Sequence, residues 1–427
     1  MSEVEALPEV AVGWKRAKLR DVAEKPQYGL TASAAKSGPV QFLRITDITE
    51  RGVDWGSVPY CASDDKTINA CLLKSGDIVF ARIGATTGKS YLINDPPHAV
   101  FASYLIRVRT HRDLDPAFLS FFFKSDDYWE QVNANKHANL KKGVNGSILS
   151  DLVVPVPPKI EQERIAEVLG TVQQAMEQQE RLIRSTTELK QALMQKLFTE
   201  GLRGEAQKET EIGAVPESWE VKPLGDLFDA QLGKMLSPKA RRGSTPLPYL
   251  RNKNVQWDGI ETDDLHLMDF DDREAAKFRL KAGDLLICEG GEVGRTALWK
   301  DQVEVCYYQK ALHRLRPKHG RMRPEYMAYW MRFAFQMNNI YGVTGTRTTI
   351  AHLPEIKLLP LLLPLPSLDE QDDIVRAIDQ VDKKLTLARK RMTTLQDLFR
   401  TLLHELMTGK VRVNQNNLST NDSTQKV

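Results

Sequence analysis

The chain has 427 residues, of which 41% are hydrophobic and 27% are charged, and its formal net charge is +3. This length exceeds what one hydrophobic core usually supports, so we expect two domains. The composition is typical of a folded soluble protein. With no apolar run of transmembrane length and no signal-peptide pattern at the start, it indicates a cytoplasmic protein without a membrane partner. A charge this close to zero gives no argument for nucleic-acid binding by itself.

Two copies of one pattern follow each other along the chain. Residues 39–48 (PVQFLRITDI) match 246–255 (PLPYLRNKNV), and residues 73–84 (LKSGDIVFARIG) match 280–291 (LKAGDLLICEGG). Near the end of each copy a PxPxxxEQ pattern recurs, first from Pro155 and then from Pro364. The spacing between the copies stays nearly constant, which predicts duplicated domains.

Each copy opens with a tryptophan that we interpret as a core anchor, Trp14 and then Trp219. Strands follow, and after them a helical pattern at residues 116–133 and 324–341, where proline at the first position suits a helix start. The aromatic residues of the first helical pattern are interpreted as core packing rather than as a platform for stacked bases. They are Phe118, Phe122, Tyr128 and Trp129.

A long amphipathic helix ends each copy. In the second copy apolar residues alternate steps of four and three from Ile374 to Leu406, which indicates a coiled-coil seam. The seam of the first copy runs from Ile165 to Leu197 and includes Leu189. Three polar residues weaken its middle, Gln179, Thr186 and Lys190. Seams of about 60 Å do not stay exposed, so we expect the helices to pack on each other, and to run antiparallel if a pseudo-two-fold axis relates the copies.

Two segments come close to enzyme motifs without completing them. Residues 83–90 (IGATTGKS) carry Ile83 where a phosphate-binding loop needs its first glycine, so we predict a glycine-rich β-turn. Residues 95–98 (DPPH) carry His98 where an amino-group DNA methyltransferase needs an aromatic residue to stack on a flipped base, so we predict a proline turn before a strand. The histidines form no metal pair, and the cysteines show no metal-ligand spacing: Cys61, Cys71, Cys288 and Cys306. We therefore expect no catalytic residues, no cofactor and no metal.

Charge is unevenly distributed in the second copy. No acidic residue lies between Asp229 and Asp258 or between Glu304 and Glu325, although both stretches are rich in lysine and arginine. The two stretches either form one basic surface or are scattered, solvated charge. Acidic residues gather at 258–274. Because phosphates would repel them, we expect this segment on another face of the domain or against a protein partner.

The duplicated order of these motifs resembles the specificity subunit of type I restriction-modification systems. The resemblance covers essentially the whole chain apart from the tail. It includes a basic Gly/Asn segment at 139–147 (NLKKGVNGS), and residues 212–219 (IGAVPESW) are similar to the family's entry into its second domain.

The resemblance implies an α+β fold with two similar β-rich target recognition domains, separated by two long helices that form an antiparallel coiled coil in a pseudo-two-fold arrangement. It places the target recognition domains at residues 1–158 and 213–366 and the long helices at 159–200 and 367–409. A linker at 201–212 and a disordered tail at 410–427 complete the expected organisation.

The implied function is sequence-specific binding of double-stranded DNA as a non-catalytic subunit. Each domain would read one half of a bipartite, asymmetric target and so direct methylation and restriction. The helices would set the spacing and dock two methyltransferase subunits, through which the motor and nuclease subunits join. Two alternatives from other classes are a standalone DNA modification enzyme and a coiled-coil scaffold that never contacts nucleic acid.

Candidate DNA contacts follow from side-chain chemistry, because arginine suits guanine, asparagine suits adenine and lysine mostly holds phosphates. In the first copy the candidates are Arg44, Arg82, Thr86, Thr87, Lys89, Lys141, Lys142 and Asn145. In the second copy they are Arg251, Lys253, Asn254, Arg295, Lys310, Arg347 and Thr348. Arg44 and Arg251 recur in a strand, so a structural role is the alternative for both. Different lengths after Gly143 and Gly345 leave the residue correspondence between the two basic loops open.

Overall fold

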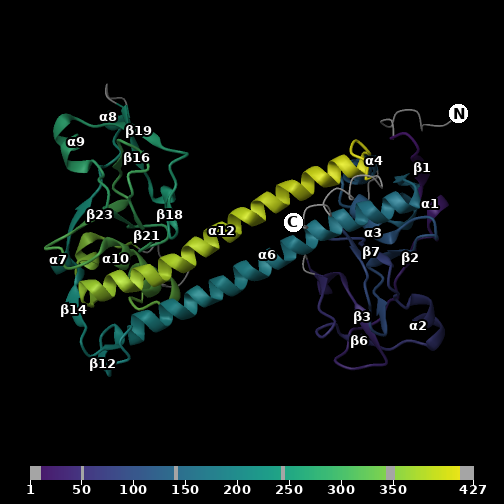
Figure 1. Ribbon diagram of the computed structural model, residues 1–427, viewed down its shortest axis with the longest axis horizontal. Coiled ribbons are helices and arrows are strands. Elements are labelled where there is room, and N and C mark those ends of the chain that lie inside the picture. The colour runs from purple at the N-terminus through teal and green to yellow at the C-terminus, as the bar shows by residue number, and fades with distance from the viewer. Residues whose placement is uncertain (1–10, 50–51, 139–142, 242–245, 343–351, 414–427) are drawn as a thin grey trace, which may run out of the picture. The chain divides into compact units, whose positions relative to one another are not determined.

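The computed structural model describes residues 11–49, 52–138, 143–241, 246–342 and 352–413. The chain divides into two compact units (Figure 1): unit 1 takes the residues up to Arg181 and from Arg389 onward, and unit 2 takes Leu182–Ala388. Each boundary falls inside a long helix, whereas the division expected from the sequence treats each long helix as a segment of its own.

Unit 1 is built on two small sheets. The four-stranded sheet has the order β2 (Gln27–Tyr28), β10 (Leu105–Val108), β7 (Ile78–Ala81), β8 (Ser90–Leu92), with every pair antiparallel. The three-stranded sheet has the order β6 (Tyr60–Cys61), β3 (Val40–Leu43), β9 (Ala99–Phe101), and β3 runs parallel to β9. Two further pairs are β1 (Lys15–Lys18) with β11 (Val153–Val156), and β4 (Ile48–Thr49) with β5 (Gly52–Val53).

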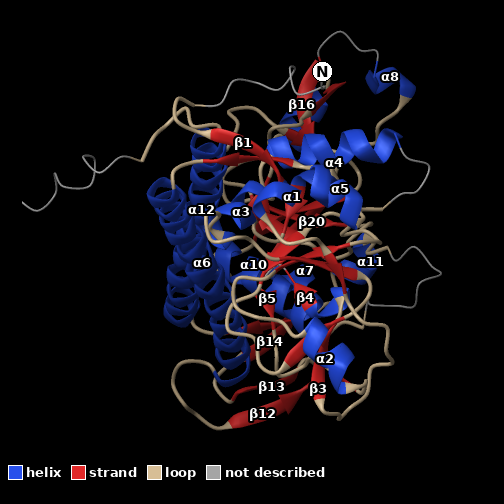
Figure 2. Cartoon of the chain, turned by 90° about the vertical axis from the view of Figure 1, so that its right-hand side faces the viewer, coloured by secondary structure: helices blue, strands red, loops and turns tan. Residues whose placement is uncertain are grey.

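Unit 2 repeats this topology strand for strand. Its four-stranded sheet has the order β15 (Phe228–Leu232), β23 (Leu312–Pro317), β20 (Leu285–Cys288), β21 (Thr296–Leu298). Its three-stranded sheet has the order β19 (His266–Asp269), β16 (Pro246–Leu250), β22 (Tyr307–Tyr308). The further pairs are β14 (Glu220–Pro223) with β24 (Leu362–Leu365), and β17 (Val255–Gln256) with β18 (Gly259–Ile260). A hairpin of β12 (Gln207–Thr210) and β13 (Gly213–Pro216) precedes them (Figure 2).

The four-stranded sheet of each unit separates two hydrophobic cores. In β7, Ile78 and Phe80 belong to one core and Val79 to the other, and all three are buried. In β20, Leu285 and Ile287 face one core while Leu286 faces the other. Successive side chains of a strand point to opposite faces of its sheet. An uninterrupted apolar run therefore places apolar side chains on both faces, and both faces of this sheet are buried.

Short helices close the cores. Unit 1 has α1 (Leu19–Val22), η1 (Ile45–Asp47), α2 (Asp65–Cys71), α3 (Pro116–Phe122), α4 (Asp126–Ala138) and α5 (Gly146–Asp151). Unit 2 has α7 (Leu224–Leu227), α8 (Pro238–Arg241), η2 (Asn252–Asn254), α9 (Asp272–Phe278), α10 (Pro324–Met331), η3 (Arg332–Met337) and α11 (Glu355–Leu358). The helical patterns that begin at Pro116 and Pro324 are therefore each broken into two pieces. The predicted core role of the aromatic stripe is confirmed, since Phe118, Phe122 and Tyr128 are buried.

The two long helices are α6 (Lys159–Glu200) and α12 (Leu368–Met407). In unit 1, Ile165 and Leu169 of α6 share a core with Leu403 and Leu406 of α12. In unit 2 the ends are exchanged, and Met194 and Leu197 of α6 pack with the start of α12. The helix segments therefore pack on each other inside each unit, as the seams predict, and run antiparallel there (Figure 1), as expected for copies related by a pseudo-two-fold axis. Their pseudo-two-fold relation stays a prediction.

One seam residue is assigned wrongly from the sequence. Leu189 is 58% exposed, whereas Thr186 and Lys190 are buried. The alternating steps of four and three from Ile165 pass through Thr186 and Lys190 and miss Leu189, so the polar residues occupy the true seam positions.

The PxPxxxEQ pattern fixes the start of each long helix to its domain. The side chain of Gln162 is fully buried, accepts a hydrogen bond from the Asp115 backbone at 2.7 Å and donates to the Pro157 carbonyl at 2.8 Å. Gln371 repeats this arrangement with the Arg323 backbone at 2.7 Å and the Pro366 carbonyl at 3.0 Å. The PxPxxxEQ pattern therefore recurs because its glutamine connects the start of each long helix to the backbone of the domain.

In each unit an ion pair, which we call the clasp, joins the start of one long helix to the end of the other. It is formed by the glutamate of the PxPxxxEQ pattern and an arginine that follows the other helix. In unit 1 the Arg412 guanidinium donates to both carboxylate oxygens of Glu161, at 2.6 and 2.8 Å. In unit 2, Arg203 Nε lies 3.6 Å from Glu370. Both glutamates are buried. The two units therefore use one kind of clasp.

Candidate nucleic-acid interface

Four segments of unit 1 meet beside the first strand of its four-stranded sheet. The backbone of Arg82, after β7, donates to the Tyr104 carbonyl at 3.0 Å and accepts from Val144 at 3.1 Å. The Gly146 backbone donates to the Tyr28 hydroxyl at 2.9 Å. We call this group of Tyr28, Arg82, Tyr104 and residues 143–146 the unit 1 tip.

Large side chains at the unit 1 tip face solvent. Tyr28 is 41% exposed and Tyr104 is 56% exposed. The Arg82 guanidinium lies 5.0 Å from the centre of the Tyr28 ring, which is cation–π distance. An arginine held over an aromatic ring beside a second exposed aromatic residue offers donors for base edges and faces for stacking. Sequence reasoning selected Arg82 but missed both tyrosines, because nothing local marks an exposed aromatic residue in a strand or turn.

The unit 2 tip has the same backbone framework with different side chains. Glu289 takes the place of Arg82, since its backbone donates to the Ala311 carbonyl at 3.0 Å and accepts from Leu353 at 2.8 Å. Ala311 thus takes the place of Tyr104, and Leu232 at the end of β15 takes the place of Tyr28. The two tips match in framework and differ in the chemistry they present.

These backbone bonds also settle the loop correspondence left open by the sequence. Val144 and Leu353 are equivalent because the backbone of each donates to the residue that follows the matching strand, Arg82 after β7 and Glu289 after β20. His352 therefore matches Gly143, whereas pairing Gly143 with Gly345 gives unequal lengths. With this match the second copy has one additional residue between Pro324 and Leu353, since the offset between the copies is 208 at Pro116 and 209 at Val144.

A buried histidine anchors the loop exit in unit 2. His313, in β23, is fully buried, and its Nε2 lies 3.0 Å from the Leu353 carbonyl. Burial lowers the pKa of His313, so the ring is neutral and Nε2 carries the proton that it donates. In unit 1 the apolar Ile106 occupies the matching position of the sheet.

The glycine turn that imitates a phosphate loop is a β-turn, as predicted. Thr87 donates its hydroxyl to the Gly84 carbonyl at 2.7 Å, and Thr86 is half-buried. Gly88 packs against the Trp129 ring and Lys89 is exposed. The turn therefore presents Lys89 to solvent and keeps the Thr87 hydroxyl for its own backbone.

Arg44 and Arg251 follow β3 and β16 directly instead of lying in a strand, and both are held in ion pairs. Arg44 binds Asp47 through Nε at 3.1 Å and a terminal nitrogen at 2.7 Å, which raises the pKa of Arg44. Arg251 binds Asp264 at 2.9 Å, and Lys253 pairs with the same carboxylate. Lys253 and Arg251 together lower the pKa of Asp264 to about 2. This geometry favours the framework role for both arginines.

Two more second-copy candidates are engaged inside unit 2. Asn254 is 2% exposed, and its side chain accepts from the Arg251 backbone at 2.9 Å and donates to the Glu261 carbonyl at 3.1 Å. Arg295 donates to Glu292 at 3.0 Å and to the Asn252 carbonyl at 2.8 Å. Both therefore connect turns to one another.

The remaining candidates lie in turns and loops. Asn145 is exposed and caps α5 by accepting from the Ile148 backbone at 2.9 Å. Lys310 is exposed in the turn before β23. The last four candidates fall outside the described residues: Lys141, Lys142, Arg347 and Thr348.

The expectation that the acidic segment 258–274 lies away from the basic stretches is wrong. Strand β19 pairs with β16, which brings the acidic segment beside the basic one. Asp264 then pairs with Arg251 and Lys253, and Glu274 pairs with Lys234. The acidic residues therefore neutralise three cations of this stretch within the unit, Lys234, Arg251 and Lys253.

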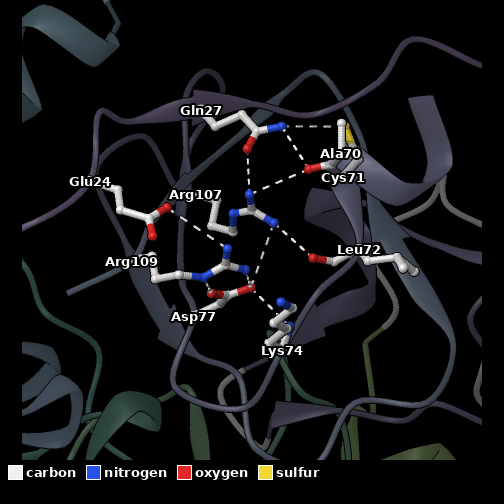
Figure 3. Close-up of polar contacts among 9 residues, drawn as sticks. All are labelled: Glu24, Gln27, Ala70, Cys71, Leu72, Lys74, Asp77, Arg107 and Arg109. Carbon is white, nitrogen blue, oxygen red and sulfur yellow. Dashed lines mark hydrogen bonds and ion pairs between the residues drawn. The ribbon is translucent and has the colours of Figure 1, made fainter. Parts of the chain in front are cut away.

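The aspartate of the repeated Gly-Asp pair contacts two further arginines, of which Arg107 is buried and Arg109 is half-buried (Figure 3). Asp77 binds the Arg109 guanidinium at 2.7 and 2.9 Å and lies 3.7 Å from Arg107. Arg107 is 5% exposed and donates to the Leu72 carbonyl at 2.7 Å. Asp284 and Arg316 repeat the pair in unit 2 at 2.6 and 2.9 Å. These arginines hold the sheets and are not offered to a ligand.

The cysteines, the possible metal ligands and the apolar helices show no further functional site among the described residues. All four cysteines are buried free thiols, and burial raises the pKa of Cys288 to about 11 and of Cys306 to about 12. Within the described ranges, no group of three or more His, Cys, Asp or Glu residues is placed to hold a metal ion. Among the same residues, no helix is long and apolar enough to cross a membrane.

Comparison with known proteins gives a consistent set of relatives. A family model described as "Type I restriction modification DNA specificity domain" matches residues 11–184 and 216–397. The MjaVIII type I restriction enzyme specificity subunit of Methanocaldococcus jannaschii is 23% identical over 353 residues, covering 80% of this chain and 80% of the relative. The EcoBI type I restriction enzyme specificity subunit of Escherichia coli is 21% identical over 313 residues, covering 64% and 62%.

Solved structures show the same fold. The S subunit of a type I restriction-modification system from M. genitalium superposes with a TM-score of 0.59 at 15% identity, covering 94% of this chain and 98% of that chain. A chain from a study of complex assembly and conformational transition in a type I R-M system superposes with a TM-score of 0.53 at 17% identity, covering 95% and 100%.

Proposed function

The chain belongs to the family of type I restriction-modification DNA specificity domains, and we propose from this that it is a specificity subunit whose two units each read one half of a bipartite, asymmetric DNA target. One observation carries the proposal. The two tips share a backbone framework but present Tyr28, Arg82 and Tyr104 in unit 1, against Leu232, Glu289 and Ala311 in unit 2. Two similar frameworks with different side chains at matching positions suit two different half-sites.

The contacts we propose are graded by exposure. Arg82 is our base-reading candidate in unit 1, and Lys89, Asn145 and Lys310 are candidates for phosphate or base contacts. The loop candidates Lys141, Lys142, Arg347 and Thr348 remain proposals on their side-chain chemistry. Thr86 and Thr87 support the turn that carries Lys89. The ion pairs and burial described above favour a supporting role for Arg44, Arg251, Lys253, Asn254 and Arg295.

We further propose that the chain has no catalytic residues and acts with partners. Two methyltransferase subunits would bind it and carry out the methylation, and restriction subunits would join through them. The isolated chain, given S-adenosylmethionine and duplex DNA, should then show no methyl transfer. Transfer that persists after rigorous removal of partner subunits would favour a standalone modification enzyme instead.

The direct test is DNA binding by the chain together with its methyltransferase partner. Selection from a random duplex library should return two unlike half-sites separated by a gap of unspecified sequence. Affinity should fall steeply with salt, because phosphate contacts release counterions. An undivided or palindromic motif would contradict two-unit reading, and binding that is absent at all salt concentrations would favour a scaffold without nucleic acid.

A further inference from the structure

Each unit contains a joint where its domain packs against the paired segments of α6 and α12. The joint of unit 2 contains Lys190 of α6 and Tyr329 of α10. In unit 1 the matching positions hold Phe399 of α12 and Phe121 of α3. The match follows from the repeat, since Lys190 and Phe399 lie equally far along their helices from the glutamate of the PxPxxxEQ pattern.

The joint of unit 2 is ionic and buried. The Lys190 side chain is 6% exposed, and its Nζ lies 2.5 Å from Asp382 Oδ1 of α12. The single proton of the Tyr329 hydroxyl is shared between Asp379 at 2.6 Å and Asp382 at 2.9 Å. Lys190 Nζ also lies 5.5 Å from the centre of the Tyr329 ring. A lysine this buried depends on its carboxylate partner.

The joint of unit 1 holds no such pair among the described residues. The Phe121 and Phe399 rings lie 6.1 Å apart. Gln173 of α6 takes the place of Asp382 and accepts a hydrogen bond from Lys124 Nζ at 2.6 Å. The charge of Glu177, which is exposed on α6, favours protonated Lys124, although burial lowers the pKa of that lysine. In unit 1 the position that matches Lys190 is therefore the apolar Phe399, and Lys124 already lies beside it.

These differences bear on which helices pair. Because the copies repeat one another, α6 of one chain has a second possible partner, the α6 of another copy of the chain. Such a pairing would keep the clasp, since Arg203 would meet Glu161 as Arg412 does. Space would not prevent it either, because a cavity of about 490 Å³ lies beside Phe399 and Lys124.

We propose that the Lys190–Asp382 pair is the element that makes α6 pair with α12 and not with α6 of a second copy. In the α6–α6 arrangement Lys190 would enter the unit 1 joint beside Lys124 and Gln173, without Asp382. In the α12–α12 arrangement Asp379 and Asp382 would face Phe399 instead of a lysine, with Arg332 already bound to Asp258. Each wrong pairing thus leaves a charge of the joint without its partner, and in the α6–α6 arrangement that charge is the buried lysine, which is a costly mismatch at an interface.

The experiment starts from the full chain with a protease site inserted after Gly204, an exposed glycine with open space around its Cα. After cleavage the two halves are unfolded together in denaturant, refolded, and weighed by native mass spectrometry. The variant Lys190→Phe with Asp382→Gln gives both helices the residues of the unit 1 joint. The control, Leu189→Phe with Lys383→Gln, introduces the same two residues, phenylalanine and glutamine, at adjacent exposed positions.

The native halves and the control should return almost only the heterodimer. In the Lys190→Phe, Asp382→Gln variant the product of the two homodimer concentrations, divided by the square of the heterodimer concentration, should rise at least tenfold toward the value of about one quarter expected without preference. Equal scrambling of native and variant halves, or equally exclusive heterodimers in both, would overturn the proposal.

A second measurement on the uncut chain covers the case in which the halves do not refold. Asp382→Gln alone leaves the buried Lys190 without its carboxylate, and Lys190→Phe alone leaves the half-buried Asp382 without its lysine, so each should lower the denaturant midpoint of unit 2. The double variant should recover most of that loss, because neither charge remains. Additive losses in the double variant would show that the two residues are not coupled and would equally overturn the proposal.

Discussion

His313 makes the stability of unit 2 depend on pH. Its pKa in the folded chain is lowered from 6.5 by burial, so below pH 6.5 the unfolded chain binds a proton that the folded chain does not. The stabilising contribution is complete above pH 6.5 and falls as the pH drops toward the folded pKa. We expect the free energy of unfolding of unit 2 to decrease there by up to about 1.4 kcal/mol per pH unit.

The control for this prediction is His313→Ile, which installs the residue that unit 1 has at this position. It leaves the Leu353 carbonyl without its partner, so unit 2 should be less stable by about 1–3 kcal/mol at neutral pH. The variant should lose the acid-side slope between pH 5 and 6.5 in denaturant titrations. Retention of the full slope would show that another group is responsible.

Asp77 is predicted to be a stability determinant of unit 1. Asp77→Ala removes the partner of Arg109 and leaves the buried Arg107 without its nearest carboxylate. We expect a loss of about 3–5 kcal/mol in the unfolding of unit 1 by denaturant. Asp397→Ala breaks a pair with Arg400, which is 79% exposed, and should cost less than about 1 kcal/mol. Similar losses in the two variants would contradict the buried network.

Sequence reasoning at this scale was strongest for framework residues. Trp14 and Trp219 are buried anchors as predicted, and the DPPH segment is a turn before β9. It was weakest for arginines, because an arginine that reads a base and an arginine that pairs with Asp264 look alike until the strand pairing is known. Tyr28 and Tyr104 gave no signal, since only the fold determines which aromatic residues remain exposed.

Among the elements, the long helices were predicted correctly in type and in pairing. Heptad spacing extends over so many turns that no other structure accommodates it. The error at Leu189 has a physical origin. A search for apolar residues prefers leucine to lysine, yet Lys190 occupies the seam because Asp382, far away in sequence, neutralises it. A partner on another element cannot be inferred from spacing along one helix.

The seam assignment leads to a paired prediction in α6. Met194 is 1% exposed and Leu189 is 58% exposed. Met194→Ala should lower the free energy of unfolding of unit 2 by about 2–5 kcal/mol, because it removes buried methylene groups and leaves a cavity. Leu189→Ala should change it by less than about 0.5 kcal/mol. The seam would need to be redrawn if denaturant titration ranked the two variants the other way.

For the whole molecule, duplication explains the repeated motifs as framework and leaves function to what differs between the copies. The Gly-Asp aspartates, the EQ pairs and the clasps recur because both units need them to fold. The tips differ because each unit is proposed to meet different bases. The density of basic residues along the second copy was a poor guide for a different reason: Lys234, Arg251, Arg316 and Arg321 of the basic stretches form ion pairs inside unit 2.

The central claim, that each unit reads its own half-site, is tested most directly by giving unit 1 the tip of unit 2. The variant Tyr28→Leu, Arg82→Glu, Tyr104→Ala keeps the framework bonds that run through the backbone of residue 82. With the partner methyltransferase present, methylated sites are mapped by sequencing in cells expressing the native or variant chain. The account predicts that one half-site changes or loses its sequence preference, while the other half-site and the gap stay as they were. A change in both half-sites, or in neither, would contradict it.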